Sequence, residues 1–212
     1  MKKIKRWEIL TIGCLTRNKF WGEPKEEGVR ECLATSSVIC TGEANIVVDP
    51  SMDPESFGQV LFNRSGLRPG DIDLVYCTHL HGDHFAGIEL FEKADWYMAS
   101  GDCEVFKQDE DNRELLRKRM KPAGDFLIPD RVHTVFLPGH TPGLSGLLFQ
   151  GPEGRVLASG DCIMTKDFFL NREGYYFDKD GEENRRSIEK AAQLAGIIIP
   201  GHGNYFISGA YR

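Results

Sequence analysis

The chain carries histidine and aspartate residues whose types and spacing are typical of a metal centre. Five of its six histidines fall in three short segments, and an aspartate stands in a fourth. These segments are His79-Leu80-His81-Gly82-Asp83-His84, Pro138-Gly139-His140, Ser159-Gly160-Asp161 and Pro200-Gly201-His202-Gly203. Together they supply seven nitrogen and oxygen ligands, enough for two zinc-like ions and a shared water. The pattern favours a metal-dependent hydrolase.

The spacing inside the first segment divides its ligands between two ions. His79 and His81 are two residues apart, so in an extended segment they face the same way and can bind one ion. Gly82 lets the chain turn, and Asp83 and His84 then begin a following helix, aimed at a neighbouring ion. The distant ligands can complete both sets: His140 with the first ion, His202 with the second, and Asp161 between them.

Apolar strand candidates come directly before these ligands. The four candidates are residues 74–78, 135–137, 156–158 and 197–199. Ligands at strand ends can converge on rigid supports, and neighbouring glycines allow the tight turns that direct their side chains. The sequence therefore predicts a site along one rim of a sheet.

The remaining periodicity indicates an α/β fold, because strands and helices alternate along the chain. Expected strands cover residues 7–15, 36–41, 45–48, 74–78, 132–137, 146–150, 155–159 and 196–199. One helix is expected to begin after an Asp53 N-cap and to end at Gly66. A second covers 188–195, and a third occupies much of 102–120.

Size and charge restrict the classes of partner. A chain of 212 residues with 41% hydrophobic content suits a single domain, residues 1–212. The net charge of −6 and pI near 5.6 give no general reason to bind nucleic acid or an anionic membrane, so a small-molecule substrate is expected. No stretch approaches the roughly 20 apolar residues that span a bilayer, and the first residues do not read as a leader. We expect a cytoplasmic protein, with a homo-oligomer possible.

The other titratable candidates are assigned structural roles. The six cysteines include no CxxC pair, so free thiols are expected rather than disulfides or a zinc knuckle. If Asp161 points at a metal from an extended segment, Cys162 points the other way. His133 lies inside an expected strand with no partner motif.

The segments, in this order, resemble the metallo-β-lactamase fold superfamily. The match consists of Thr78 to His84, Pro138-Gly139-His140-Thr141-Pro142-Gly143, Ser159-Gly160-Asp161 and Pro200-Gly201-His202-Gly203, and Asn45-Ile46-Val47-Val48-Asp49 resembles an early strand of the family. The resemblance implies an αββα sandwich, with two mixed β-sheets flanked by helices and a dinuclear metal site at one edge.

The resemblance also implies the ligand sets. It assigns His79, His81 and His140 to the first metal, Asp83, His84 and His202 to the second, and Asp161 to both. Asp83 is the expected catalytic residue, which orients the attacking water and moves its proton. Asp49 is a candidate for orienting a ligand histidine, and a plain strand-ending role is an equal alternative. Two divalent ions are the expected cofactors, with zinc first and manganese or iron as alternatives.

The expected reaction is hydrolysis of a small acyl compound, such as an ester, lactone or thioester, by a metal-activated hydroxide. The alternatives are a mononuclear iron oxidoreductase of the sulfur-dioxygenase type, a phosphodiesterase of the same fold, and a metal-stabilised binding module. Met164 stands where lactonases of the family often have a tyrosine, which does not favour that branch.

Substrate selection is expected from the loops beside the metal ligands. The segment from Met164 to Asp180 is rich in aromatic residues, and its side chains either contact the substrate or pack on the protein's own core. The expected substrate-binding residues are Phe168, Tyr175, Tyr176 and, from the loop after the first strand, Trp21.

Overall fold

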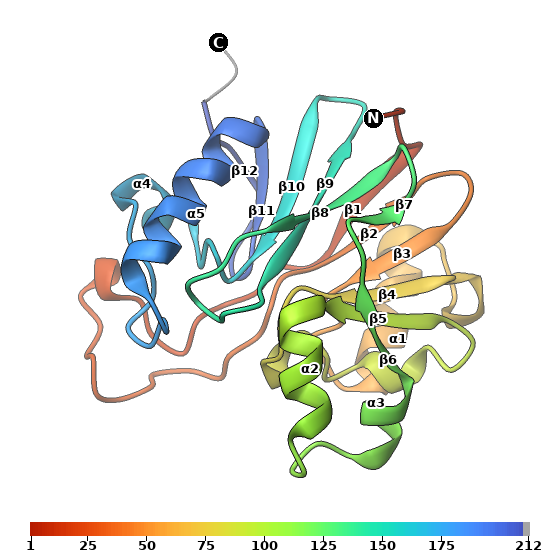
Figure 1. The fold of residues 1–212 in the computed structure, drawn as a ribbon, viewed down its shortest axis with the longest axis horizontal. Coiled ribbons are helices and arrows are strands. Elements are labelled where there is room, and N and C mark those ends of the chain that lie inside the picture. Colours follow the sequence, from red (N-terminus) through yellow and green to blue (C-terminus); the bar gives the residue numbers. More distant parts are fainter. Residues whose placement is uncertain (210–212) are drawn as a thin grey trace.

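Two six-stranded sheets stack face to face, with helices on their outer faces (Figure 1). The computed structural model describes residues 1–209. Strand order is β1-β2-β3-β4-β5-β6 in the first sheet and β12-β11-β10-β9-β8-β7 in the second. Both sheets mix parallel and antiparallel pairs, so the expected αββα sandwich is confirmed.

The first sheet is built from the amino-terminal half of the chain. Its strands are β1 (Arg6–Thr11), β2 (Ser36–Cys40), β3 (Asn45–Val48), β4 (Leu74–Cys77), β5 (Asp95–Ala99) and β6 (Met120–Ala123). β1, β2 and β3 pair antiparallel, and the pairs from β3 to β6 are parallel. Parallel neighbouring strands must be joined by crossover connections. These connections contain the α-helices α1 (Pro54–Ser65), α2 (Ser100–Gln108) and α3 (Glu114–Arg119).

The second sheet is mostly antiparallel. Its strands are β7 (Phe126–Ile128), β8 (Val132–Phe136), β9 (Ser145–Gln150), β10 (Arg155–Gly160), β11 (Ile197–Pro200) and β12 (Phe206–Ile207). Only β10 and β11 among these described strands pair in parallel. Their connection contains α4 (Lys166–Asn171) and α5 (Gly181–Leu194).

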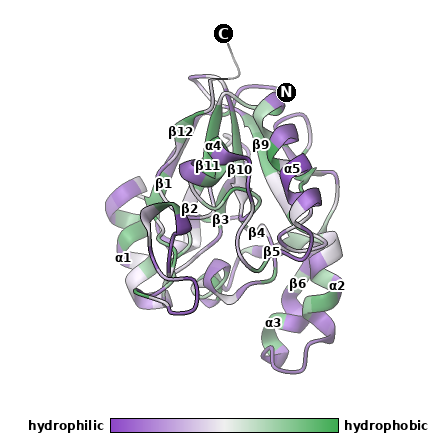
Figure 2. Cartoon of the chain, turned by 90° about the vertical axis from the view of Figure 1, so that its left-hand side faces the viewer, coloured by the Kyte–Doolittle hydropathy of each residue, from purple (hydrophilic) through white to green (hydrophobic). Residues whose placement is uncertain are grey.

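Apolar side chains fill three layers. The central layer lies between the sheets and includes Ile46 and Tyr76 from the first and Leu147, Phe149 and Ile199 from the second. The outer layers pack α1 to α3 on the first sheet and α5 on the second. Because both faces of each sheet are covered, central strands such as β3 and β11 are continuous apolar runs. Helices α1, α2 and α5 alternate between hydrophilic and hydrophobic residues along their length, as Figure 2 shows.

The first expected helix is confirmed. The Asp53 carboxylate accepts a hydrogen bond from the Ser56 N–H at 3.0 Å, and Gly66 ends α1 with a φ of 73°. The single helix expected over 102–120 is wrong, because the chain forms α2 and α3 with a break between them. Asp109 begins this break by accepting hydrogen bonds from Asp111 N–H and the Asn112 side chain, an alternative to helical pairing.

Four short strands and one helix were not expected from the sequence. They are β5, β6, β7, β12 and α4. Strand β6 lies at a sheet edge, where Pro122 is tolerated, and β12 has only two residues, so neither has a clear pattern. Strand β1 is shorter than expected and ends at Thr11 after an irregular register. Within residues 1–209, no helix combines the length and apolar character needed to cross a bilayer.

Candidate metal centre

A first group of ligand-type atoms gathers around His81. The His81 Nδ1 lies 3.0 Å from His79 Nε2 and 3.0 Å from His140 Nε2. Asp161 Oδ2 lies 3.3 Å from His140 Nε2 and 3.8 Å from His79 Nε2. One atom from each of these four residues lies within 4.8 Å of every other, a grouping compact enough for one metal ion.

A second group lies on the other side of Asp161. Its Oδ1 is 3.1 Å from His84 Nε2 and 3.3 Å from His202 Nε2. Asp83 Oδ2 lies 3.7 Å from each of the same two nitrogens. Asp161 therefore directs one carboxylate oxygen at each group. All seven residues that the sequence singled out as ligands come together.

The supports for these ligands come from both sheets, which corrects the expectation of a single sheet rim. His79 follows β4 of the first sheet, while β8, β10 and β11 of the second sheet lead to His140, Asp161 and His202. Asp83 and His84 lie in the short 3-10 helix η3 (Gly82–His84). The centre thus lies at the edge of the sandwich where ends of strands from the two sheets meet.

Close backbone packing lets these segments converge. A Cβ on Gly201 would lie 1.9 Å from Asp161 Oδ1, so only glycine fits beside the carboxylate. Gly160 has a φ of 52°, and a Cβ there would lie 2.4 Å from Thr78 Oγ1. These two glycines therefore allow the β10 and β11 ends to approach the turn after β4.

The outer ring nitrogens of four histidines face fixed acceptors. His140 Nδ1 lies 2.8 Å from Asp178 Oδ1, and His202 Nδ1 lies 2.8 Å from the Leu33 carbonyl oxygen. His84 Nδ1 lies 3.0 Å from Asp49 Oδ2. His79 Nδ1 lies 3.1 Å from Thr78 Oγ1. Each acceptor favours the proton on the outer nitrogen, so the inner Nε2 carries a lone pair that faces the centre.

Thr78 can accept from His79 because its own proton is used elsewhere. The Thr78 hydroxyl donates to Asp49 Oδ2 at 2.9 Å, and the Thr78 N–H donates to Asp49 Oδ1 at 2.8 Å. Asp49 is 2% exposed and has a φ of 50°. Its two oxygens therefore hold both the start of the histidine turn and His84, the orienting role considered for it from the sequence.

Bound cations fit this arrangement. Inward lone pairs of neutral imidazoles repel one another at 3.0 Å unless a proton or a cation lies between them. His84 Nε2 and Asp161 Oδ1 are buried and lie 3.1 Å apart, yet neither atom meets hydrogen-bond geometry with any described residue. Imidazole and carboxylate donors are those that zinc-like divalent ions prefer. The donor set thus suits metal ions better than a hydrogen-bond network.

The ionisation of the cluster agrees with this fit. Burial lowers the pKa of His79 well below its ordinary value and that of His81 to about 4, so both are neutral near pH 7 and able to bind metal. Burial also acts to lower the pKa of His84 and His202, but the Asp161 carboxylate raises both well above the usual value. The buried Asp161 carboxylate therefore favours a positive charge between His84 and His202. A metal ion would supply that charge while both imidazoles stay neutral.

Asp102 connects the two histidine-bearing loops. This buried carboxylate accepts hydrogen bonds from the Thr141 hydroxyl at 2.6 Å, the Gly143 N–H at 2.8 Å and the Leu80 N–H at 3.3 Å. Burial raises the pKa of Asp102, and these donors act in the opposite direction. Asp102 thus fixes the segment of His79 and His81 relative to that of His140.

Replacing Asp102 with alanine is expected to lower the free energy of unfolding by about 2–4 kcal/mol, because it leaves buried donors without an acceptor. Denaturant unfolding of the two proteins measures the difference. Asp111→Ala is the control, because Asp111 is exposed and its substitution should change stability by less than about 0.5 kcal/mol. Equal stability of the Asp102 and Asp111 variants would contradict this role.

Besides Asp102, two residues near the centre were missed by sequence reasoning. Asp178, whose side chain is 2% exposed, contacts His140 from the loop after α4. Cys32 is exposed, and its thiol lies 3.4 Å from Asp83 Oδ2 and 3.9 Å from His202 Nδ1. Neither stands in a motif, and each reaches the centre only through folding of a loop.

Replacing Asp178 with alanine is expected to weaken metal binding about 10–100-fold, because His140 loses the acceptor that fixes its ring and tautomer. Competition with a chromophoric chelator measures the affinity. Asp178→Asn keeps a neutral acceptor and should lose less. If both variants retain the parent affinity, Asp178 does not orient this histidine.

The other predicted residues fall in different surroundings. Phe168 is fully buried against Leu15 and Met164, so the structure places it in a small core cluster rather than on an open surface. Tyr175 and Tyr176 line a surface cavity of about 540 Å³, while Trp21 is 61% exposed and lines a separate cavity of about 310 Å³.

The two residues given structural roles also have defined places. Cys162 is buried in the apolar layer beneath α5 and belongs to none of the ligand groups. His133 is half-buried within β8.

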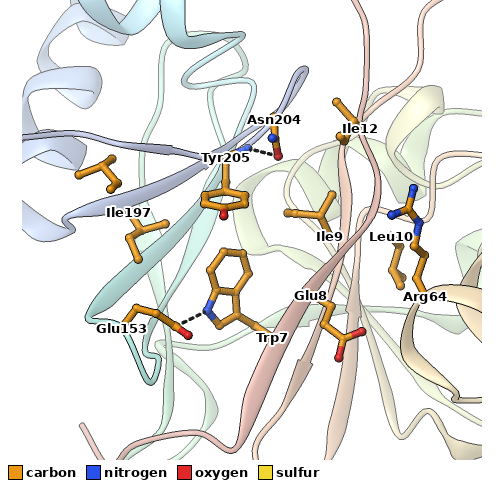
Figure 3. Close-up of a pocket in the computed structure, with 11 residues that line it drawn as sticks. Trp7, Glu8, Ile9, Leu10, Ile12, Arg64, Glu153, Ile197, Asn204 and Tyr205 are labelled. Carbon is orange, nitrogen blue, oxygen red and sulfur yellow. Dashed lines mark hydrogen bonds between the residues drawn. The ribbon is translucent and has the colours of Figure 1, made fainter.

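A wide groove of about 680 Å³ lies apart from the metal centre, between the edge strands β1 and β12 (Figure 3). Trp7 and Tyr205 meet edge to face there, with ring centroids 5.2 Å apart, and the Trp7 indole donates to Glu153 at 3.2 Å. None of the seven ligand-type residues lines this groove, so its size does not bear on the metal chemistry.

This chain is similar to proteins of known family. A family model described as the metallo-beta-lactamase superfamily matches residues 29–202. Metallo-beta-lactamase domain-containing protein 1 of Xenopus laevis is 28% identical over 191 residues, covering 87% of this chain and 78% of that protein. An N-acyl homoserine lactonase of Bacillus cereus is 28% identical over 165 residues, covering 72% of this chain and 64% of its own length. A crystal structure of a quorum-quenching N-acyl homoserine lactone lactonase superposes with a TM-score of 0.74 at 21% identity, covering 95% of this chain and 93% of that one.

Proposed function

The chain belongs to the metallo-beta-lactamase superfamily, and from this membership and the geometry of the centre we propose that it is a dinuclear metal-dependent hydrolase of small acyl compounds. Esters, lactones and thioesters are the proposed substrate class. Lactones come first, because lactone hydrolysis is the named activity of a relative whose match covers 72% of this chain. Zinc is the proposed metal, since histidine and aspartate supply all seven proposed ligands.

One observation carries the proposal most directly. Asp161 directs its two oxygens at two separate groups of histidines, and the outer nitrogens of four of these histidines face acceptors that leave their lone pairs inward. A mononuclear iron oxidoreductase does not need the second group. The complete set of Asp83, His84 and His202 beside Asp161 therefore favours hydrolysis over the oxidative alternative.

When bound, two divalent ions would supply a hydroxide at neutral pH and polarise the acyl oxygen of the substrate. The chain's residues have distinct proposed roles around that chemistry. Asp83 is the proposed catalytic residue: its side chain is 25% exposed and faces both His84 and His202, so it can accept the proton of the attacking water. The histidine rings would be held in their orientations by Asp49, Thr78 and Asp178 during each turnover.

A substrate panel tests this function. We expect protein reconstituted with zinc to hydrolyse at least one lactone, ester or thioester, and to lose that activity when a chelator removes the metal. Phosphodiesters are the control class, because the same ligands could serve a phosphodiesterase. Turnover of phosphodiesters alone, or oxygen uptake with a thiol-derived substrate and one iron per chain, would overturn the proposal.

Three expectations remain proposals alongside this activity. We propose that residues 1–212 form one domain, supported by the apolar layer that both sheets share. A small-molecule partner is likewise proposed, from net charge and pI, and a cytoplasmic location is proposed with it.

A further inference from the structure

A surface cavity of about 540 Å³ lies beside the loop that supports His140. Its lining combines two tyrosines with charged residues from three segments: Lys19, Lys25, Arg172, Glu173, Gly174, Tyr175, Tyr176, Gly181, Glu182 and Arg185. We call this the Tyr176 pocket. It contains four cationic side chains and two carboxylates, in a chain whose formal net charge is −6.

The two carboxylates of the Tyr176 pocket already have partners. Glu173 forms an ion pair with Lys19, and Glu182 lies 3.3 Å from Arg185. Lys25 and Arg172 form no ion pair with any residue between 1 and 209. The lining therefore carries an excess of positive charge that the described protein does not neutralise.

Another cation, Arg17, contacts the Tyr176 ring. The Arg17 guanidinium carbon lies 5.6 Å from the Tyr176 ring centroid and 5.2 Å from that of Phe177. Arg17 is only 9% exposed, its Nε has no hydrogen-bond partner, and no carboxylate of residues 1–209 pairs with it. The faces of the Tyr176 and Phe177 rings stabilise this charge in part. Arg17 therefore adds positive charge behind the Tyr176 ring, although it is not among the residues that line the pocket.

The backbone at the pocket floor adds to this preference. Gly181 and Glu182 are the first residues of α5, a helix of 14 residues. The Asp180 side chain occupies the Glu183 N–H, which leaves the N–H groups of the first two helical residues at the pocket lining. Helix N-termini favour anionic groups through these donors and the helix dipole.

The pocket and the metal centre share one loop, residues 172–180. Lys179 N–H donates to the His140 carbonyl oxygen at 3.4 Å, and Asp180 N–H donates to that of Gly139 at 2.9 Å. Between these residues and Tyr176 stands Asp178, which contacts the His140 ring. One short loop therefore forms part of the pocket wall and holds a proposed metal ligand, so the pocket lies on the side of the centre that carries His140.

We propose that the Tyr176 pocket binds a carboxylate or phosphate group carried by the acyl substrate, with Lys25 and Arg172 as its ion-pairing partners. This assignment rests on the proposed hydrolase function and narrows its substrate class to anionic acyl compounds. The charge of Arg17 assists by attracting anions to this side of an acidic protein.

Direct binding can be measured without any turnover. Inorganic phosphate and acetate are titrated separately into the isotope-labelled protein while amide chemical shifts are followed. We expect the amides of residues 172–182 to respond to at least one of these anions. The dissociation constant for that shift change should rise about tenfold in the double variant Lys25→Gln/Arg172→Gln, which loses two charge-assisted contacts.

The control variant removes the same charge elsewhere. Lys93 and Arg155 are exposed and line no part of the pocket, so Lys93→Gln/Arg155→Gln should bind like the parent protein. The comparison of phosphate with acetate identifies which oxyanion the pocket prefers. Absence of shifts in 172–182 with both anions, or equal weakening in the pocket and control variants, overturns the assignment.

Kinetics then test the link to substrate. For a pair of acyl substrates that differ only in a terminal carboxylate or its methyl ester, the anionic member should have the higher kcat/KM. The pocket variant should remove this preference mainly through KM, whereas the control variant Lys93→Gln/Arg155→Gln should keep the parent kcat and KM for both members. Unchanged selectivity in the variant would overturn the substrate role. Failure to hydrolyse either member would instead count against the proposed function, and the anion titration would remain interpretable.

Discussion

Replacement of Asp161 with alanine is expected to lower kcat/KM for the acyl substrate by more than about a hundredfold and to reduce the metal content below two ions per chain. Loss of a residue that only orients a ligand already costs 10–100-fold, and Asp161 contacts both groups directly. Its oxygens lie 3.1 Å from His84 Nε2 and 3.3 Å from His140 Nε2. Steady-state kinetics and elemental analysis of the same preparation measure both effects.

A control separates this result from unfolding. Asp111→Ala removes the same side chain from an exposed position and should keep full activity and metal content. The circular dichroism spectra of both variants should match that of the parent protein. An Asp161→Ala protein that binds two ions and hydrolyses its substrate at the parent rate would rule out a bridging role.

Asp49→Ala is expected to be the most destabilising substitution near the centre, lowering the free energy of unfolding by about 3–5 kcal/mol. The carboxylate is buried and compensates His84 while accepting two hydrogen bonds from Thr78, so its loss leaves several buried polar groups without a partner. The left-handed φ of 50° adds strain when alanine occupies this position. Denaturant unfolding in the presence of chelator isolates the effect from metal binding.

Asp49→Asn is the matched comparison. Asparagine tolerates the left-handed conformation and keeps one acceptor for the Thr78 N–H, but it removes the negative charge beside His84. We expect it to be more stable than Asp49→Ala and less stable than the parent. Equal stability of all three proteins would show that Asp49 is merely a strand-ending residue.

The ligand-type residues could be found from the sequence because each segment keeps its own local signal. In the first segment, alternation and the glycine turn predict that His79 and His81 face one way and that Asp83 and His84 lie beyond. His140, Asp161 and His202 each follow an apolar run by a few residues, and the structure brings all of them to this turn. Their roles as metal ligands remain proposals.

The supporting residues could not be found in the same way. Asp178 and Asp102 reach the histidine loops across long separations in the chain, 38 residues from His140 and 22 from Leu80. Asp102 stands in a stretch of charged residues that reads as a solvated helix face, and Asp178 ends an aromatic segment that gives no sign of a histidine partner. Their burial results from packing between loops, and no periodic pattern in a single sequence encodes it.

The fold class followed from the alternation of strands and helices together with the family resemblance, while the shorter elements did not. Edge strands such as β6 and β12 have weak patterns because few neighbours restrict their composition. Phe168 shows a related ambiguity: its loop is aromatic whether it lines a substrate pocket or packs inward. Phe168 contacts Leu15 and Phe20, so its side chain packs inward.

Anomalous X-ray diffraction from crystals of the zinc-loaded protein, recorded on both sides of the zinc absorption edge, tests the dinuclear assignment most directly. The account predicts two zinc peaks, one among His79, His81 and His140 and the other among Asp83, His84 and His202, with Asp161 between them. No peak among these residues, or a single peak confined to the first group, would contradict a dinuclear centre.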